Sequence, residues 1–316
     1  MSTNLPPNIV REDDGTYAAI YGPFALHTAF QPIFRQNAGG GLRLQAFEGL
    51  IRPSKSGVSC PPFALFRAVS PEDRGMVDAL CRRLHMLNMG QMNRPGAALF
   101  LNFDPSLFED ARTTAREADS VCDLAYQIGL APHQVVCEIT EKKAHNRSAL
   151  VAIVEDFRER GFRVAVDDYG AAESDIDRIE LLRPDIVKFD GEWVLRYMEH
   201  QPGIDLLKET AARFRANGIT TLFEGLEESW QVDLAISMKI DLFQGYAIAK
   251  PQMLPTTFAT LFPIDPDPEP RVALDGASLA CQHQREDGPA LAAIAASVAT
   301  APVRRPPRRT FGRRGG

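Results

Sequence analysis

The chain has 316 residues, of which 45% are hydrophobic and 24% charged, and its formal net charge is −6. This composition is typical of a globular protein, and the length fits either one large α/β barrel or two ordinary domains. No apolar run approaches the roughly 18 residues of a membrane-spanning helix, and the N-terminus lacks the basic start and apolar core of a secretory signal. We therefore expect a cytoplasmic protein without a transmembrane segment.

Positive charge is concentrated at the C-terminal end. The last thirteen residues contain six arginines, and without them the net charge of the chain falls from −6 to −12. An acidic body does not suit duplex nucleic acid, which binds through cations that neutralise phosphates. The five cysteines are scattered and form no CxxC pair, which favours reduced thiols over disulfides or a zinc site.

Runs of β-branched and aromatic residues alternate with amphipathic stretches along the chain. Eight such runs predict strands, at residues 26–34, 42–52, 97–103, 135–140, 163–168, 185–190, 219–224 and 241–249. The amphipathic stretches between them predict helices, among them residues 71–92, 147–161 and 203–218. This alternation predicts an α/β fold of the TIM-barrel type.

The first two predicted strands break the pattern. Only the short glycine-rich stretch 37–41 separates them, which is too little chain for a parallel crossover. We therefore predict an antiparallel hairpin at the start of the barrel.

Composition divides the chain into three segments. Residues 1–19 are an N-terminal extension, residues 20–262 form the predicted barrel domain, and residues 263–316 are rich in proline, alanine and arginine. Alternate prolines predict an extended linker at 263–270, and the rest of the tail is predicted to be disordered, with a marginal helix at 289–300. The tail arginines are interpreted as a solvated end, with contact to an anionic partner as the alternative.

Acidic residues recur where predicted strands end. Five carboxylates interrupt otherwise apolar segments: Glu48, Glu138, Asp167, Asp168 and Glu224. Isolated buried carboxylates are strongly unfavourable, so these groups need partners. The C-terminal ends of barrel strands converge on one face, and a single strand-borne lysine there, Lys188, cannot neutralise five acids. The pattern indicates bound divalent metal ions.

The ligand atoms indicate which metal. With the amide of Asn102 added, the candidate set offers only oxygen, which suits Mg²⁺ or Mn²⁺ better than zinc. Asp167 and Asp168 are adjacent and cannot both point into the barrel from a regular strand, so we expect the backbone to bend there. Two metals side by side would hold a phosphodiester and lower the pKa of a bridging water.

As a set, these motifs resemble the EAL-domain cyclic di-GMP phosphodiesterases over about residues 24–251. The matching stretches, in the order of the family, are FQPIF, FEGLIR, LFLNFD, CEITE, VAVDDYG, IVKFD, FEGLE and FQGYAIAKP. The resemblance implies a modified TIM (β/α)8-like barrel with an antiparallel first strand. It also implies hydrolysis of cyclic di-GMP to linear pGpG with two Mg²⁺ or Mn²⁺ ions, inhibition by Ca²⁺, a homodimer, and a role in bacterial signalling that controls biofilm and motility.

The resemblance assigns roles to the polar residues at the strand ends. Metal ligation, directly or through water, is implied for Glu48, Asn102, Glu138, Asp167, Asp168 and Glu224. Lys188 would orient the attacking water and offset phosphoryl charge, and Gln244 would hold a metal-bound water. The implied catalytic set is Glu48, Lys188, Glu224 and Gln244.

Further roles are implied around this set. Gln31, Arg52 and Asp190 are grouped as substrate contacts, and the planar guanidinium of Arg52 suits phosphate. Glu141 would fix the loop after the double aspartate, and Glu227, together with Asp190, would support the metal ligands.

The chain departs from the family pattern at two positions. Gly49 replaces the usual alanine of the motif that names the family, a change that costs of order 0.5–1 kcal/mol in a strand. Ala172 replaces the second glycine of the loop after the double aspartate, which puts the setting of that loop, and with it rate and regulation, in doubt.

Two other functions stay open beside the hydrolase. The first is a binding module that senses cyclic di-GMP, or grips a protein, through the same groove without turnover. The second is another metal-assisted barrel enzyme such as an enolase-type lyase, which also carries acids and a lysine at strand ends. The FQPIF and FQGYAIAKP stretches weigh against the lyase, and the complete set of acids weighs against the binding module.

Overall fold

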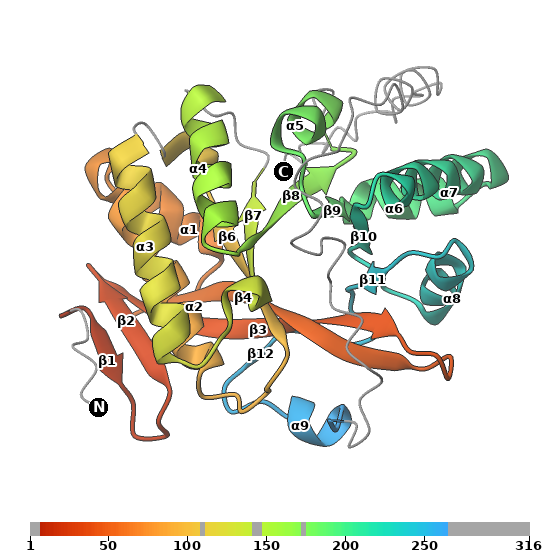
Figure 1. The fold of residues 1–316 in the computed structure, drawn as a ribbon. Helices are drawn as coiled ribbons and strands as arrows, with labels where there is room; N and C mark the ends of the chain where they lie inside the picture. Colours follow the sequence, from red (N-terminus) through yellow and green to blue (C-terminus); the bar gives the residue numbers. More distant parts are fainter. Residues whose placement is uncertain (1–6, 108–110, 141–146, 172–174, 265–316) are drawn as a thin grey trace, which may run out of the picture.

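The computed structural model describes residues 7–107, 111–140, 147–171 and 175–264. Within these ranges eight strands form a closed barrel (Figure 1), which confirms the predicted α/β fold. In ring order the strands are β3 (Phe24–Gln36), β4 (Leu42–Lys55), β6 (Ala98–Phe103), β7 (Val135–Ile139), β8 (Arg163–Tyr169), β9 (Ile186–Phe189), β10 (Thr220–Phe223) and β11 (Leu242–Phe243).

Strand β3 is antiparallel to both of its neighbours in the barrel. It pairs with β4 along almost its whole length and with β11 at Phe34, and that second pairing closes the ring. The other neighbouring strands of the ring are parallel. The β3–β4 turn is held by the Asn37 backbone N–H, which donates to the Gly41 carbonyl at 2.8 Å. The predicted antiparallel hairpin is confirmed.

The N-terminal extension adds two strands to the outside of this hairpin. Strands β1 (Ile9–Arg11) and β2 (Tyr17–Tyr21) are antiparallel, and β2 pairs with β3. The buried amide of Asn88 holds β2 by accepting from the Tyr17 N–H at 2.8 Å and donating to the Tyr17 carbonyl at 2.9 Å. The sequence analysis expected no strand here, because the partner that fixes this short segment lies on a helix far along the chain.

Helices surround the barrel, with α3 and α4 on one flank and α6, α7 and α8 on the other (Figure 1). The α-helices are α1 (Pro62–Ala68), α2 (Arg74–Met89), α3 (Ala111–Gln127), α4 (Arg147–Glu159), α5 (Asp175–Leu182), α6 (Gly191–Met198), α7 (Gln201–Ala216), α8 (Ser229–Ser237) and α9 (Phe258–Leu261). Short 3-10 turns are η1 (Pro71–Asp73), η2 (Pro105–Leu107) and η3 (Pro132–Gln134), and two-residue strands are β5 (Val58–Ser59) and β12 (Gln252–Met253). No helix among the described residues has the length and apolar character that crossing a membrane requires.

The last barrel strand is much shorter than expected. The sequence predicted a strand over 241–249, but β11 ends at Phe243 and the chain turns away from the sheet. The cause is a close approach of two loops, because a Cβ added at Gly245 would lie 2.0 Å from the Leu226 carbonyl oxygen. That same carbonyl accepts from the Ala247 N–H at 2.9 Å, so the loop after β10 captures the backbone that would have continued the strand.

A layer of apolar side chains fills the barrel interior. Each ring strand contributes to it, and its members are Ile33, Ala46, Ala98, Phe100, Val136, Ala165, Ile186, Leu222 and Leu242. A second, larger core lies between the strands and the helices. Because side chains alternate between the two faces of a strand, the residue two positions beyond each interior residue also faces the barrel axis.

Helix α2 is packed closely against the hairpin at Gly49. A Cβ added at Gly49 would lie 2.8 Å from Cγ and 2.9 Å from Cβ of His85, closer than real Cβ contacts. The His85 ring is buried, and its Nδ1 is 2.9 Å from Oγ1 of Thr28 on β3. The glycine that departs from the family pattern is therefore the residue that makes room for His85.

We expect Gly49→Ala to lower the free energy of unfolding by about 1–3 kcal/mol, because the added methyl overpacks the His85 contact. In a His85→Gly background, which is itself less stable, the same change costs less than about 1 kcal/mol, because both His85 atoms that the added methyl would meet are then absent. Urea denaturation of the four proteins of this double-mutant cycle measures the coupling. Equal costs of Gly49→Ala in both backgrounds would contradict it.

His85 also predicts an acid sensitivity of folding. Burial, with the nearby Arg82 and Arg52 charges, lowers the pKa of His85 from 6.5 to about 3. The unfolded chain therefore binds more protons than the folded one between these two values, so stability is lost as the pH falls below 6.5. Between pH 6.5 and pH 5 this group removes about 2 kcal/mol of folding free energy.

The measurement is urea denaturation at both pH values for the parent and for His85→Gln. Between pH 6.5 and pH 5, His85→Gln is expected to lose about 2 kcal/mol less folding free energy than the parent. His133→Gln, a change at an exposed histidine, serves as the control and retains the loss of the parent. An unchanged pH dependence in His85→Gln would refute the assignment.

Candidate metal centre

The polar residues predicted as the site form a second layer above the apolar interior of the barrel. Each lies two residues beyond an interior residue of its strand, so strand alternation turns its side chain toward the axis. One such residue lies on or directly after each parallel strand of the ring. In the order β4, β6, β7, β8, β9, β10 and β11, they are Glu48, Asn102, Glu138, Asp167, Lys188, Glu224 and Gln244. On the antiparallel β3, Gln31 is paired in register with Glu48. Residues from all eight ring strands thus share one end of the barrel.

The ammonium group of Lys188 is the centre of this layer. Its Nζ lies 2.5 Å from Oε1 of Glu138, 2.6 Å from Oε1 of Glu224 and 2.9 Å from Oδ1 of Asp167. Oε1 of Glu48 is farther away, at 3.9 Å. Lys188 is 1% exposed and Glu138 is fully buried, so these charges interact with little screening by water.

The protonation equilibria of the layer are strongly perturbed. Burial raises the pKa of Glu138 well above its usual value, and burial also raises that of Glu224 to about 8, in both cases against the opposing attraction of Lys188. Burial alone would lower the pKa of Lys188, but the surrounding carboxylates, Asp167 foremost, outweigh it and hold the pKa well above the usual value. Lys188 therefore stays charged, and its single positive charge is smaller than the combined negative charge of the acids around it when they are ionised.

The double aspartate has the expected bend. Asp168 has a φ of +55°, and the register between β8 and β9 shifts between Val166 and Tyr169. This irregularity lets both carboxylates approach the same space, since ligand oxygens of Asp167, Asp168 and Glu224 all lie within 4.8 Å of one another. The predicted break in strand alternation is confirmed.

The donor set fits hard divalent cations. Four carboxylates surround one ammonium group, and a fifth, that of Asp168, lies beside Asp167 and Glu224. Every donor of the second layer other than Lys188 offers oxygen. Oε2 of Glu138 is buried and has no hydrogen-bond partner among the described residues. A buried carboxylate oxygen without a partner is unfavourable, and oxygen-only shells suit Mg²⁺ or Mn²⁺.

The two glutamines and Arg52 are placed around these acids. Gln244 is buried, and its Nε2 donates to Oε2 of Glu48 at 2.8 Å, which orients that carboxylate. Gln31 is partly exposed beside Glu48. Arg52 lies farther along β4, and its Nη1 donates to the Ile51 carbonyl at 3.0 Å, so the guanidinium lies outside the Lys188 cluster.

The remaining predicted residues lie outside the central cluster. The Asp190 carboxylate begins α6 by accepting from the Trp193 N–H at 2.7 Å, and the Trp193 ring packs so closely on Gly170 that a Cβ there would lie 2.4 Å from it. Asp190 therefore supports the backbone directly after the double aspartate. Glu227 is exposed on the loop after β10. Glu141 and Ala172 lie outside the described residues, as does the tail beyond residue 264.

Arg82 on α2 was missed by the sequence analysis. Its guanidinium is 3% exposed, forms ion pairs with Asp78 and with Oε1 of Glu117, and donates from Nη1 to the Asn102 carbonyl at 3.2 Å. Burial opposes its charge, but the two carboxylates raise its pKa above the usual value. Arg82 thereby ties α2 and α3 to the strand end that carries Asn102. An arginine with an acid four residues earlier, on a helix otherwise rich in apolar residues, was the available signal.

Arg82→Met is expected to lower the free energy of unfolding by about 3–5 kcal/mol, because the Asp78 and Glu117 carboxylates, which are only 16% and 18% exposed, lose the counter-charge of Arg82. Urea denaturation measures the loss. Adding Asp78→Asn and Glu117→Gln to Arg82→Met recovers at least half of it. Arg83→Met, a change at the next residue, is the matched control and costs less than about 1 kcal/mol. Equal losses for the two single variants would contradict the role of Arg82.

Comparisons with known proteins agree with this geometry. A family model described as the EAL domain matches residues 24–251. The protein named probable cyclic di-GMP phosphodiesterase PdeA of Escherichia coli (strain K12) is 26% identical over 230 residues, which is 71% of this chain and 30% of that protein. The chain therefore spans under a third of that relative's length.

Solved structures show the same fold. The Klebsiella pneumoniae BlrP1 complex with manganese and cyclic di-GMP at pH 9.0 has a TM-score of 0.63 and 26% identity, over 73% of this chain and 57% of that one. A standalone EAL protein from Vibrio cholerae O395, in its cyclic di-GMP bound form, has a TM-score of 0.62 at 22% identity, over 73% of this chain and 94% of that one. A barrel with an antiparallel first strand and acids at its mouth defines an α/β barrel of the EAL type. This chain belongs to the EAL domain family.

Proposed function

We propose that this protein hydrolyses cyclic di-GMP to linear pGpG with two Mg²⁺ or Mn²⁺ ions. The observation that carries the proposal is the cluster of four carboxylates around Lys188, with Asp168 beside two of them, at one end of the barrel. Relatives named cyclic di-GMP phosphodiesterases, and structural neighbours that hold manganese or calcium with this dinucleotide, support the choice of substrate and of metal class.

In the reaction a water oxygen attacks phosphorus, the bond from phosphorus to one ribose O3′ breaks, and that oxygen takes up a proton. Divalent cations, when bound, would lower the pKa of a water molecule and place positive charge near the phosphate oxygens. The residues that would hold them are Glu48, Asn102, Glu138, Asp167, Asp168 and Glu224.

Protein groups other than the metal ligands act on water and phosphate. Lys188 remains protonated in its acid cluster, so it acts as a fixed positive charge that orients the attacking water and offsets the negative charge developing on the phosphoryl oxygens. Gln244 fixes the Glu48 carboxylate through its 2.8 Å hydrogen bond. Gln31 beside Glu48, and Arg52 farther along β4, extend the site toward the substrate, where the planar guanidinium of Arg52 would pair with the second phosphate.

Purified protein incubated with cyclic di-GMP and Mn²⁺ or Mg²⁺ is expected to release pGpG, followed chromatographically. Removal of the metal with EDTA stops the reaction, readdition restores it, and Ca²⁺ does not support it. We expect Glu48→Gln and Lys188→Met each to lower turnover by at least ~100-fold, because a metal ligand or a charge that stabilises the transition state is lost.

The matched controls are Glu192→Gln and Lys208→Met, which change exposed residues of the same types and leave turnover unchanged. Near-normal rates in Glu48→Gln or Lys188→Met would contradict the assigned roles. Absence of turnover in the parent, together with retained binding of cyclic di-GMP in Ca²⁺, would select the receptor function instead.

The homodimer and the role in biofilm and motility remain predictions from the family resemblance, and the cytoplasmic location remains a prediction from the N-terminal sequence. Contact between the arginine-rich tail and an anionic partner also stays a prediction, since residues 265–316 lie outside the described part of the chain.

A further inference from the structure

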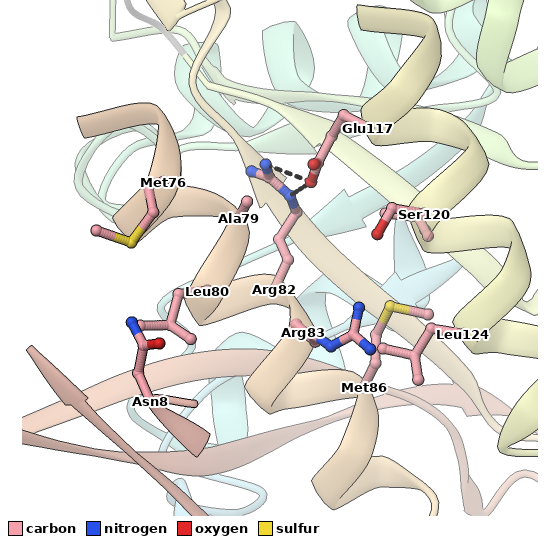
Figure 2. A pocket seen from close by; sticks show the side chains of 11 residues that line it. Asn8, Met76, Ala79, Leu80, Arg82, Arg83, Met86, Glu117, Ser120 and Leu124 are labelled. Atoms are coloured by element: carbon pink, nitrogen blue, oxygen red, sulfur yellow. Dashed lines mark hydrogen bonds and ion pairs between the residues drawn. The ribbon is translucent and has the colours of Figure 1, made fainter. Parts of the chain in front are cut away.

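Two cavities adjoin on the outer side of the barrel, between α2 and α3. The first has a volume of about 220 Å³ and is walled mainly by apolar side chains, among them Met76, Leu80, Met86 and Leu124 (Figure 2). The second has a volume of about 380 Å³ and is polar, with Arg116, Asp119, Asp123 and Gln127 in its walls. The two share Arg83, Ser120 and Leu124, so an apolar chamber opens beside a polar one.

Arg83 lies where the two cavities meet, and no described carboxylate forms an ion pair with it. Its Nε is buried without a hydrogen-bond partner, and among the described residues the guanidinium makes neither a hydrogen bond nor an ion pair. Arg82, the residue before it, is fully engaged with Asp78, Glu117 and the Asn102 carbonyl. A guanidinium with a buried, unused donor at the border of an apolar cavity favours an oxyanion as its partner.

The surroundings narrow the class of anion. Glu117 in the first cavity is paired with Arg82 and Asp119 in the second with Arg160. Asp123, also in the second cavity, has no ion pair among the described residues, so it would repel a dianionic phosphate more strongly than a carboxylate with one charge. The apolar wall adds a preference for a hydrocarbon body, since burying such a body against it is favourable. We propose that the double cavity binds a small amphipathic carboxylate, with the carboxylate on Arg83 and the hydrocarbon part between Met76, Leu80, Met86 and Leu124.

This site is separate from the metal centre and does not depend on the reaction proposed there. The double cavity is nevertheless close to the metal centre in the structure, because Arg82 lines the first cavity and donates to the backbone carbonyl of Asn102. Binding is therefore measured directly on the full chain, without cyclic di-GMP and without metal.

Calorimetric titration with sodium octanoate at fixed ionic strength is expected to show saturable binding of one molecule per chain. Octanamide has the same length and no charge, and binds at least ~10-fold more weakly, as expected when a charge-assisted hydrogen bond is lost. Arg83→Met keeps an apolar side chain, removes the guanidinium, and weakens octanoate binding by at least the same factor. Arg74→Met, a change at an exposed arginine of α2 outside both cavities, leaves it unchanged.

A second variant keeps the test decisive if Arg83→Met is poorly folded. Ser120→Asp places a carboxylate on the exposed face of α3 beside Arg83, where it competes for the guanidinium and repels the ligand, and it also weakens octanoate binding at least ~10-fold. Absence of saturable octanoate binding to the parent overturns the proposal. So does octanamide binding as tightly as octanoate, or unchanged octanoate binding in a folded Arg83→Met or Ser120→Asp.

Discussion

The buried ammonium group of Lys188 is surrounded by carboxylates, and the arrangement of the whole site at this end of the barrel depends on it. Lys188 lies within 3 Å of an oxygen from each of three acids on three other strands, and a fourth acid lies 3.9 Å away. In a poorly screened interior like charges repel strongly, and one positive charge cannot balance them all. The oxygen donors of the cluster therefore suit additional cations, and the proposed function rests on them.

The barrel makes this arrangement possible through strand alternation and closure. Alternation raises one polar side chain above one apolar side chain on each strand, and closure brings these side chains from around the ring to a common axis. The antiparallel β3 extends the same end, because its pairing with β4 sets Gln31 opposite Glu48. Strand β8 is irregular at this end, where the positive φ of Asp168 brings a second aspartate toward the carboxylate oxygens of Asp167 and Glu224.

Helix α2 connects this site to the outer layers of the fold. Three of its polar residues are buried and each binds a different partner: Arg82 holds the Asn102 carbonyl, His85 contacts Thr28, and Asn88 holds the backbone of β2. Buried polar groups of this kind fix the position of a helix, since a shift would leave each of them without a partner. Gly49 is part of the same fit, because only a residue without a side chain leaves room for His85.

The sequence alone determined the strand-and-helix alternation, the hairpin and the identity of the acids, because local periodicity and a short connection encode them. It also predicted the bend at the double aspartate from the impossibility of pointing two adjacent side chains the same way. The early end of β11, the strands of the N-terminal extension, the burial of Arg82 and the fit of His85 to Gly49 were decided by the tertiary structure. Each depends on contact between segments far apart in the chain, such as Leu226 with Gly245, and such contacts leave no local pattern to read.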